Sequence, residues 1–142
     1  MPPPSAASGT LPTWRWSGPL AAATRALSFL GTVPKSGADI ADPEVRRTFP
    51  SMSQLPVVAL NSLLDLMPRV RADLPEIRVP SLILHGDRDR TAPPACARTL
   101  LREIGTIDKR LVRLPRSGHV ITVDRDRDQV AREIAGFLEQ KV

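Results

Sequence analysis

Residues 79–89 read VPSLILHGDRD, and this stretch decides the fold that the sequence predicts. Its first part, Val79 to Leu84, is a short and nearly continuous apolar run. Such a run is typical of a strand that is buried on both faces of a parallel sheet. A loop rich in charged residues, His85 to Pro93, follows directly. The pattern therefore predicts a buried strand whose carboxyl end is followed by polar groups.

The segments after this loop complete an α/β pattern. Residues 93–104 are predicted as a helix, because two prolines open it and Gly105 favours its end. Residues 111–114 form a second predicted strand, and residues 128–139 a closing helix. The order strand, helix, strand, helix implies parallel pairing through a right-handed crossover. The first helix has an apolar face of Ala97, Leu100, Leu101 and Ile104, and the closing helix is expected to bury Val130, Ile134, Phe137 and Leu138.

Three carboxylates, Asp124, Asp126 and Asp128, lie near the start of the closing helix. Negative charge at a helix N-terminus complements the helix dipole. We therefore expect these side chains to stabilise the first turn of that helix.

Upstream of residue 75 the sequence predicts helices and loops. Residues 57–74 have a helical apolar stripe that is expected to face the core, and Pro68 is expected to kink or split this helix because it lacks an N–H donor. Residues 31–52 are predicted as a loop with Pro34, Gly37, Pro43 and Pro50 as breakers, and residues 20–30 are predicted as a helix. Residues 1–19 are predicted as a loose, proline-rich tail with two unexplained tryptophans. The apolar stripe of the helix predicted over residues 57–74 comprises Val57, Leu60, Leu64, Met67 and Leu74, with Leu63 and Val70 beside it.

The composition is that of a globular protein with an excess of basic residues. The chain has 142 residues, of which 42% are hydrophobic and 25% charged, and its formal net charge is +5. The arginines alternate with acids, as in residues 87–90 and 124–128, and few aromatic residues are present. A nucleic-acid-binding face usually has clustered basic residues without such acids. Binding to nucleic acid is therefore a minor alternative.

The cysteine content and hydropathy exclude several classes of protein. A single cysteine, Cys96, excludes an intramolecular disulfide and a cysteine-based zinc site, and no cofactor or metal ion is expected. No apolar run approaches the roughly 18 residues that a membrane helix needs. The first residues also lack the basic region of a signal peptide. We therefore expect a soluble, cytoplasmic protein.

Two loops contain the residues best suited to catalysis. The first follows residues 79–84 and contains Asp89, and the second follows residues 111–114 and contains His119. Ligands bind at the carboxyl ends of strands in open α/β sheets, and neighbouring parallel strands bring these ends together. A buried carboxylate that binds the Nδ1–H of a histidine is the orienting half of a nucleophile–His–Asp triad. Asp89 and His119 are therefore predicted to meet and to act as an acid–base pair.

The sequence of residues 77–138 resembles the C-terminal third of α/β-hydrolase fold esterases, specifically the bacterial carboxylesterase and monoacylglycerol lipase branch. The matching stretches are VPSLILHGDRD at residues 79–89, Pro93, and SGHVITVD at residues 117–124. The resemblance implies Asp89 as the triad acid, His119 as the triad base, and an ester as the small-molecule substrate. Residues 37–43 and the helix of residues 55–74 are similar to the lid of these esterases and the helix that follows it.

Two further polar residues of the first loop are not expected to be catalytic. Asp87 occupies a position that varies in the family, so we interpret it as a turn-forming residue. His85 lies at the strand end, outside the catalytic positions of the family, and is interpreted as a packed or hydrogen-bonding histidine.

The nucleophile of that family is missing from this sequence. A serine in a Gly-x-Ser-x-Gly elbow supplies it, and no such stretch occurs in the 142 residues. The oxyanion hole is missing as well, because its donors come from the residue after this serine and from an early loop. We therefore expect a truncated or mis-started hydrolase, marginally stable alone and inactive unless the N-terminal half completes it.

The expected organisation is a partial α/β-hydrolase fold: its last two parallel strands with their helices, plus part of a helical lid. It divides into a tail (1–19), a lid-like helical segment (20–75) and a C-terminal lobe with Asp89 and His119 (76–142). Two alternatives remain for the function. One is a non-catalytic module that binds a partner or dimerises through an exposed sheet edge, and the other is the nucleic-acid-binding protein mentioned above. The sequence does not indicate the oligomeric state.

Overall fold

The computed structural model describes residues 25–26, 29, 31–35 and 37–141. The proline-rich tail and most of the helix expected over residues 20–30 lie outside these residues. Within residues 20–30, Arg25, Ala26 and Phe29 are described: the first two are α-helical and Phe29 is in a 3-10 conformation.

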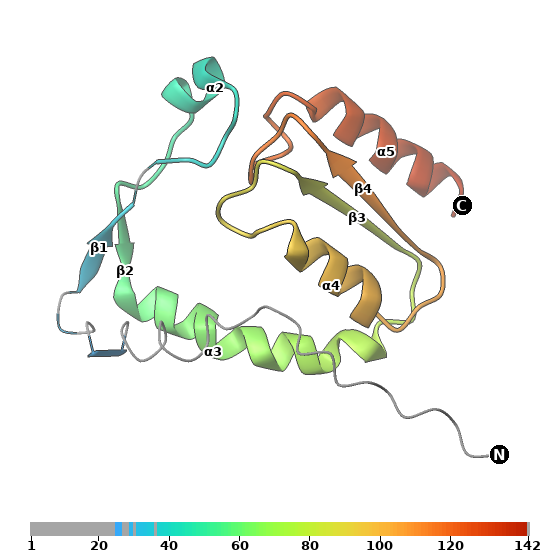
Figure 1. The fold of residues 1–142 in the computed structure, drawn as a ribbon, viewed down its shortest axis with the longest axis horizontal. Coiled ribbons are helices and arrows are strands. Elements are labelled where there is room, and N and C mark those ends of the chain that lie inside the picture. Colours follow the sequence, from blue (N-terminus) through green and yellow to red (C-terminus); the bar gives the residue numbers. More distant parts are fainter. Residues whose placement is uncertain (1–24, 27–28, 30, 36, 142) are drawn as a thin grey trace.

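The C-terminal part of the chain is the α/β unit that the sequence predicts. Strand β3 (Ser81–Gly86) pairs in parallel with β4 (Lys109–Leu114), in a register that places Ser81 beside Lys109 and Gly86 beside Leu114. Helix α4 (Ala95–Glu103) connects the two strands, and α5 (Arg127–Glu139) follows β4. Figure 1 shows α4 and α5 on opposite sides of the strand pair. The parallel pairing confirms the predicted fold class, and the element boundaries differ from those predicted by up to two residues.

The expectation that the first strand is buried on both faces is wrong. Residues 81–85 are all partly exposed, and Gly86 is the buried residue of β3. The sheet that contains β3 has two strands in the described part of the chain, so each strand has one unpaired edge. An apolar run of this kind is usually covered by further strands and helices, and two strands with one helix on each side provide less cover.

The closing helix is also less buried than predicted. Val130 is buried and Phe137 is half-buried, whereas Ile134 and Leu138 are exposed. Helical spacing correctly identifies the apolar side of α5. It does not determine how much of that side another element covers.

The long helix upstream is α3 (Val57–Asp73), followed by the short 3-10 helix η3 (Leu74–Glu76). Pro68 lies inside α3 without splitting it. Its missing N–H leaves one carbonyl without an intrahelical partner, and the other hydrogen bonds of the helix preserve its course. The predicted stripe faces the core: Val57, Leu64 and Leu74 are buried, and Leu60 and Met67 are half-buried. Leu63 and Val70 are exposed.

The segment expected to be a loop contains regular structure. Strand β1 (Thr32–Pro34) pairs in antiparallel fashion with β2 (Gln54–Pro56), and α2 (Pro43–Thr48) lies between them in the sequence. The start of α2 has a local signal: the Asp42 carboxylate accepts hydrogen bonds from the N–H groups of Glu44 and Val45 at 3.0 and 3.4 Å, and Pro43 opens the first turn. Of the prolines interpreted as breakers, Pro43 therefore begins a helix and Pro34 ends a strand, whereas Pro50 lies in the loop between α2 and β2.

No helix in the described residues is long and apolar enough to cross a membrane.

The burial of Ile40 offers a test of the fold. Ile40 is 0% exposed, although it belongs to an irregular segment, and Ile107 is 99% exposed. Ile40→Ala is expected to lower the free energy of unfolding by about 2–5 kcal/mol, because it removes buried methyl groups and leaves a cavity. Ile107→Ala should change it by less than about 0.5 kcal/mol. Urea denaturation followed by circular dichroism measures both, and equal effects would contradict the placement of Ile40.

Candidate active site

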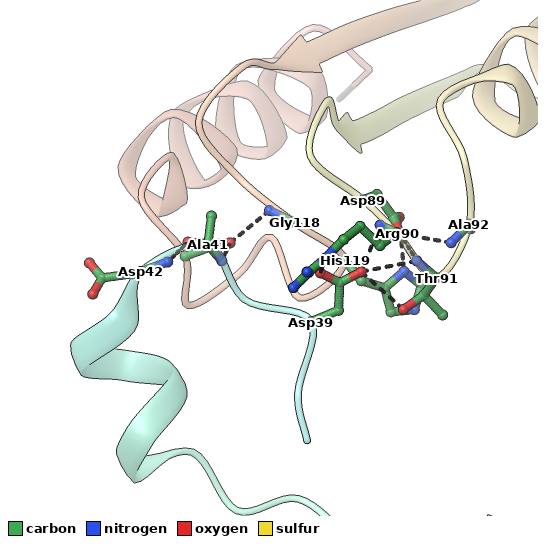
Figure 2. A network of polar contacts seen from close by, with 10 residues as sticks. Asp39, Ala41, Asp42, Asp89, Arg90, Thr91, Ala92, Gly118 and His119 are labelled. Atoms are coloured by element: carbon green, nitrogen blue, oxygen red, sulfur yellow. Dashed lines mark hydrogen bonds and ion pairs between the residues drawn. The ribbon is translucent and has the colours of Figure 1, made fainter. Parts of the chain in front are cut away.

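Asp89 and His119 meet at the carboxyl ends of the two parallel strands. Asp89 lies in the loop after β3 (residues 87–94, the acid loop), and His119 lies in the loop after β4 (residues 115–126, the histidine loop). Their side chains are joined by a hydrogen bond of 2.9 Å between His119 Nδ1 and Asp89 Oδ2. Figure 2 shows the two side chains together with the residues around them. The parallel register thus unites residues that are 30 positions apart in the sequence.

The carboxylate of Asp89 is buried and oriented by its own loop. Its Oδ1 accepts hydrogen bonds from the backbone N–H groups of Thr91 and Ala92, at 2.8 and 2.7 Å. The other oxygen, Oδ2, is therefore the one that faces His119. A carboxylate held in this way can orient an imidazole and stabilise its protonated form.

The imidazole of His119 has one nitrogen bound to Asp89 and one available to a substrate. A carboxylate accepts hydrogen bonds and cannot donate them, so Nδ1 has the proton and Nε2 has the lone pair. No described residue forms a hydrogen bond with Nε2, and the His119 side chain is 47% exposed. This arrangement allows Nε2 to take a proton from a nucleophile placed beside it.

His85 and Asp87 lie beside this pair in different roles. His85 Nδ1 is 2.9 Å from the carbonyl oxygen of Gly86, and His85 Nε2 is 3.5 Å from Asp89 Oδ2. The Asp87 carboxylate accepts a hydrogen bond from Arg113 Nε at 2.8 Å. His85 is thus a hydrogen-bonding histidine, as interpreted from the sequence. Asp87 lies in a turn and in addition forms an ion pair with β4.

Asp124 has a different role from the one expected. It is 0% exposed and lies before the first turn of α5, which begins at Arg127. It instead accepts hydrogen bonds of 2.7–2.9 Å from four backbone N–H groups, those of Ala41, Asp42, Gly118 and Arg125. Burial alone would raise the pKa of Asp124, but these hydrogen bonds together outweigh it and lower the pKa. Asp124 therefore connects the histidine loop to the segment of residues 38–42.

Asp126 likewise binds groups of the histidine loop. It accepts hydrogen bonds from the backbone N–H and Nε of Arg116 at 2.8 and 2.7 Å, and from the Ser117 hydroxyl at 2.9 Å. Burial raises the pKa of Asp126, and the hydrogen bonds of Arg116 and Ser117 lower it further than burial raises it. Ser117 is 0% exposed and also accepts the N–H of Asp126, so it is unavailable as a nucleophile. Among the three carboxylates, Asp128 alone lies in the first turn of α5.

Asp39 is a site residue that the sequence reasoning did not identify. Its Oδ2 accepts hydrogen bonds from the N–H of Arg90 at 2.7 Å and from the N–H and hydroxyl of Thr91 at 2.9 and 3.0 Å. Its backbone oxygen accepts the N–H groups of His119 and Val120, at 2.9 and 3.2 Å. Burial raises the pKa of Asp39, and the hydrogen bonds from Arg90 and Thr91 lower it below its ordinary value. A lone aspartate 51 and 52 residues before Arg90 and Thr91 has no local signal that could reveal these contacts.

Two glycines allow the loops to approach one another. A Cβ atom on Gly118 would lie 2.8 Å from the backbone oxygen of Asp39, and one on Gly86 would lie 2.1 Å from the backbone oxygen of Gly118. Side chains at these positions would separate the end of β3, the histidine loop and residue 39. Glycine is therefore required here for close backbone contact.

In the part of the chain that the structure describes, no group of three or more histidine, cysteine, aspartate or glutamate residues is arranged to bind a metal ion.

Comparisons with known proteins agree on one family. The family model described as serine aminopeptidase, S33 matches residues 41–126. A thermostable monoacylglycerol lipase from Bacillus sp. (strain H-257) is 33% identical over 102 residues, which are 72% of this chain and 40% of that protein. A carboxylesterase from Bacillus subtilis (strain 168) is 30% identical over 97 residues, which are 68% of this chain and 39% of that protein. The chain thus spans about two fifths of the length of these relatives.

Two solved structures share the fold. One is described as that of metagenome-derived lipolytic enzymes, with a TM-score of 0.75 and 26% identity over 89% of this chain and 52% of that one. The other is a monoacylglycerol lipase from Paleococcus ferrophilus, with a TM-score of 0.71 and 21% identity over 84% of this chain and 51% of that one.

The lowered pKa values of Asp124 and Asp126 predict how stability depends on pH. A carboxyl group whose folded-state pKa is lowered stabilises the fold above its ordinary pKa, which is 3.8 here, and loses this contribution as the pH falls through the lower folded-state value. The free energy of unfolding should therefore decrease on acidification from about pH 5 to pH 2.

The Asp124→Asn variant should be less stable at pH 7 and should lose less stability on acidification than the wild type. Asp128→Asn is the matched control, because the side chain of Asp128 is 84% exposed. It should retain the wild-type pH dependence. Urea denaturation at a series of pH values measures these differences, and an unchanged pH dependence in Asp124→Asn would contradict the assigned role.

Proposed function

Because the chain belongs to the serine aminopeptidase S33 family of α/β hydrolases, we propose that Asp89 and His119 are the acid and the base of a serine ester hydrolase. The observation that supports these roles is the 2.9 Å hydrogen bond from His119 Nδ1 to Asp89 Oδ2, with Nε2 left available. The predicted partial α/β-hydrolase fold agrees with the solved lipolytic structures.

In the proposed reaction, His119 Nε2 accepts the proton of a serine hydroxyl as the serine oxygen attacks the ester carbonyl carbon. The Asp89 carboxylate stabilises the imidazolium that forms. His119 then donates this proton to the leaving alkoxide, which departs as an alcohol and leaves an acyl-serine. In the second half, His119 takes a proton from water, the hydroxide displaces the acyl group as a carboxylic acid, and the proton returns to the serine.

The serine of this reaction is not among the 142 residues, because they contain no Gly-x-Ser-x-Gly stretch. The buried position of Ser117 excludes the serine closest in sequence to His119. An enzyme that loses its triad still accelerates hydrolysis by roughly 10³–10⁴ through its oxyanion hole and substrate binding. The present residues are expected to lack these donors too, so we propose that they are inactive without a segment that supplies them.

The proposed substrate is a carboxylic ester or an acylglycerol. The names of two relatives, a monoacylglycerol lipase and a carboxylesterase, support this class.

The proposed domain organisation consists of a lid-like segment over residues 20–75 and a C-terminal lobe over residues 76–142. The hydrogen bonds that Ala41 and Asp42 donate to Asp124, and the one that Asp39 accepts from Arg90, would then connect the two. The cytoplasmic location stays a prediction.

A module that pairs through its sheet edge is the second candidate. The two strands of the β3–β4 sheet each have an edge without a partner in the described residues. Light scattering would support this candidate if the chain formed a stable, symmetric dimer. The nucleic-acid alternative is weaker, because several arginines pair with acids, as in Arg71–Glu103, Arg110–Glu133, Arg113–Asp87 and Arg116–Asp126.

The isolated chain should show no hydrolysis of short- or medium-chain acyl esters that His119→Ala removes. Without a nucleophile, the acid–base pair has no hydroxyl to activate. Release of p-nitrophenol from p-nitrophenyl esters measures this. A rate that depends on His119 would overturn the proposed inactivity.

A chimera tests the proposed roles directly. Residues 31–142 would replace the matching C-terminal part of the Bacillus sp. monoacylglycerol lipase, which supplies the rest of the fold. If the chimera hydrolyses esters, His119→Ala should lower kcat by at least about 10⁴-fold and Asp89→Asn by roughly 10³–10⁴-fold.

His85→Ala is the matched control in the chimera, because His85 is the second histidine near Asp89 and has no proposed part in proton transfer. It should change kcat by less than about tenfold. Equal losses in the His85 and His119 variants would contradict the assignment.

A further inference from the structure

The segment of residues 38–42 lies against both loops of the candidate site. Its side-chain contacts reach the acid loop, where Asp39 Oδ2 binds the backbone of Arg90 and Thr91. Its backbone contacts reach the histidine loop, where the oxygen of Asp39 accepts the N–H of His119 at 2.9 Å. Figure 2 shows Asp39 next to His119 and near Arg90 and Thr91 of the acid loop. A single residue thus contacts the backbone on either side of the Asp89–His119 hydrogen bond.

Asp39 is also connected to the carboxylate of Asp89 through a shared hydrogen-bond donor. The N–H of Thr91 donates to both carboxylates, at 2.9 Å to Asp39 Oδ2 and at 2.8 Å to Asp89 Oδ1. A shift of the Thr91 backbone would therefore move the group that orients Asp89. Because Oδ1 is held in this way, the direction of Oδ2 toward His119 depends on the same backbone.

The hydrogen bonds of the Asp39 carboxylate are suited to hold the backbone of the acid loop in place. Its side chain is 13% exposed, and its strongest partners are N–H groups at 2.7–2.9 Å, whereas the nearest Arg90 side-chain nitrogen is 3.5 Å away. Hydrogen bonds to a charged acceptor are stronger than neutral ones and have better defined geometry. Gly118 allows this approach, since a Cβ there would lie 3.0 Å from Asp39 Oδ1.

We propose that Asp39 is a positioning residue that holds the acid loop and the histidine loop in the register at which Asp89 binds His119. The effect of Asp39 on catalysis rests on the function proposed above. The Asp89–His119 hydrogen bond that it maintains can be measured without catalysis. Asp39 is not proposed to contact the substrate or the reacting atoms. It acts through the Thr91 N–H and through the backbone of His119.

The segment should stay in place when the charge of Asp39 is removed. Ala41 and Asp42 would still donate to Asp124 at 2.7 and 2.9 Å, and the backbone oxygen of residue 39 would still accept from His119. Asp39→Asn therefore weakens the contact with the acid loop and retains the shape of the side chain. Asp39→Ala removes that contact entirely.

Proton NMR of the ¹⁵N-labelled full chain tests the proposal, because the chain has two histidines and the loss of signals in His119→Ala identifies the His119 ring. The readout is the exchange with water of the His119 Nδ1 proton, relative to the exchange of backbone amides in β4. In Asp39→Asn this proton should exchange roughly tenfold faster, a typical coupling between residues of one hydrogen-bond network. Asp39→Ala should give a larger increase, and the exchange of the backbone amides in β4 should stay as in the wild type in both variants.

Asp42→Ala is the matched control, because it removes a carboxylate from the same segment and leaves the contacts of Asp39 intact. Asp42 caps α2 through the N–H groups of Glu44 and Val45. The His119 proton should exchange in this variant as in the wild type. The proposal is overturned if Asp39→Asn leaves the exchange unchanged, or if Asp42→Ala increases it equally. If Asp39→Ala does not fold, the comparison between Asp39→Asn and Asp42→Ala still tests the proposal.

The ester-hydrolysing chimera separates this proposal from the proposed function. There Asp39→Asn should lower kcat by roughly tenfold with little change in KM, because it affects the orientation of the base more than substrate binding. If the NMR exchange changes but His119→Ala leaves the chimera active, the positioning role holds and the catalytic assignment fails. If His119→Ala abolishes activity but Asp39→Asn changes neither exchange nor kcat, the catalytic assignment holds and the positioning role fails.

Discussion

The buried carboxylate of Asp124 is the constraint on which the candidate site depends. It accepts four backbone N–H groups from three separate stretches of chain: residues 41–42, Gly118 and Arg125. A buried carboxylate is stable only when such donors replace the water that it loses. The loops must therefore adopt the conformation that directs these N–H groups inward. His119 directly follows Gly118, so its position is a consequence of this arrangement.

The candidate site is held mainly by polar contacts between loops. Asp39, Asp124 and Asp126 each bind backbone N–H groups, and hydrogen bonds lower the pKa of all three against the effect of burial. The apolar contribution is smaller, because β3 is half-exposed and Ile134 and Leu138 of α5 face solvent. The geometry of Asp89 and His119 can thus persist beside a sheet that is thinly covered. Because these hydrogen bonds are made by ionised carboxylates, the geometry also depends on the charge of Asp39, Asp124 and Asp126.

Local patterns in the sequence predicted some of the helices and strands and did not predict others. The apolar run before His85 and the Pro-Pro and Gly105 signals predicted β3 and α4 closely, since their determinants lie within a few residues. The helix α2 was missed although Asp42 and Pro43 form a recognisable N-terminal signal, because the prolines nearby were interpreted as breakers. The strands β1 and β2 have weak local signals and form through pairing with each other. The exposure of Ile134 was not predictable from helical spacing, which identifies a side of the helix but not what covers it.

The sequence by itself determined the order of strands and helices after residue 76, the two loops at the strand ends, and the candidate pair Asp89 and His119. It could do so because apolar periodicity, helix-end residues and the adjacency of consecutive parallel strands are local or nearly local properties. Only the tertiary structure decided the roles of Asp39, Asp124 and Asp126. Their partners lie up to 83 residues away in the sequence, and no local pattern shows which distant N–H group a carboxylate will accept.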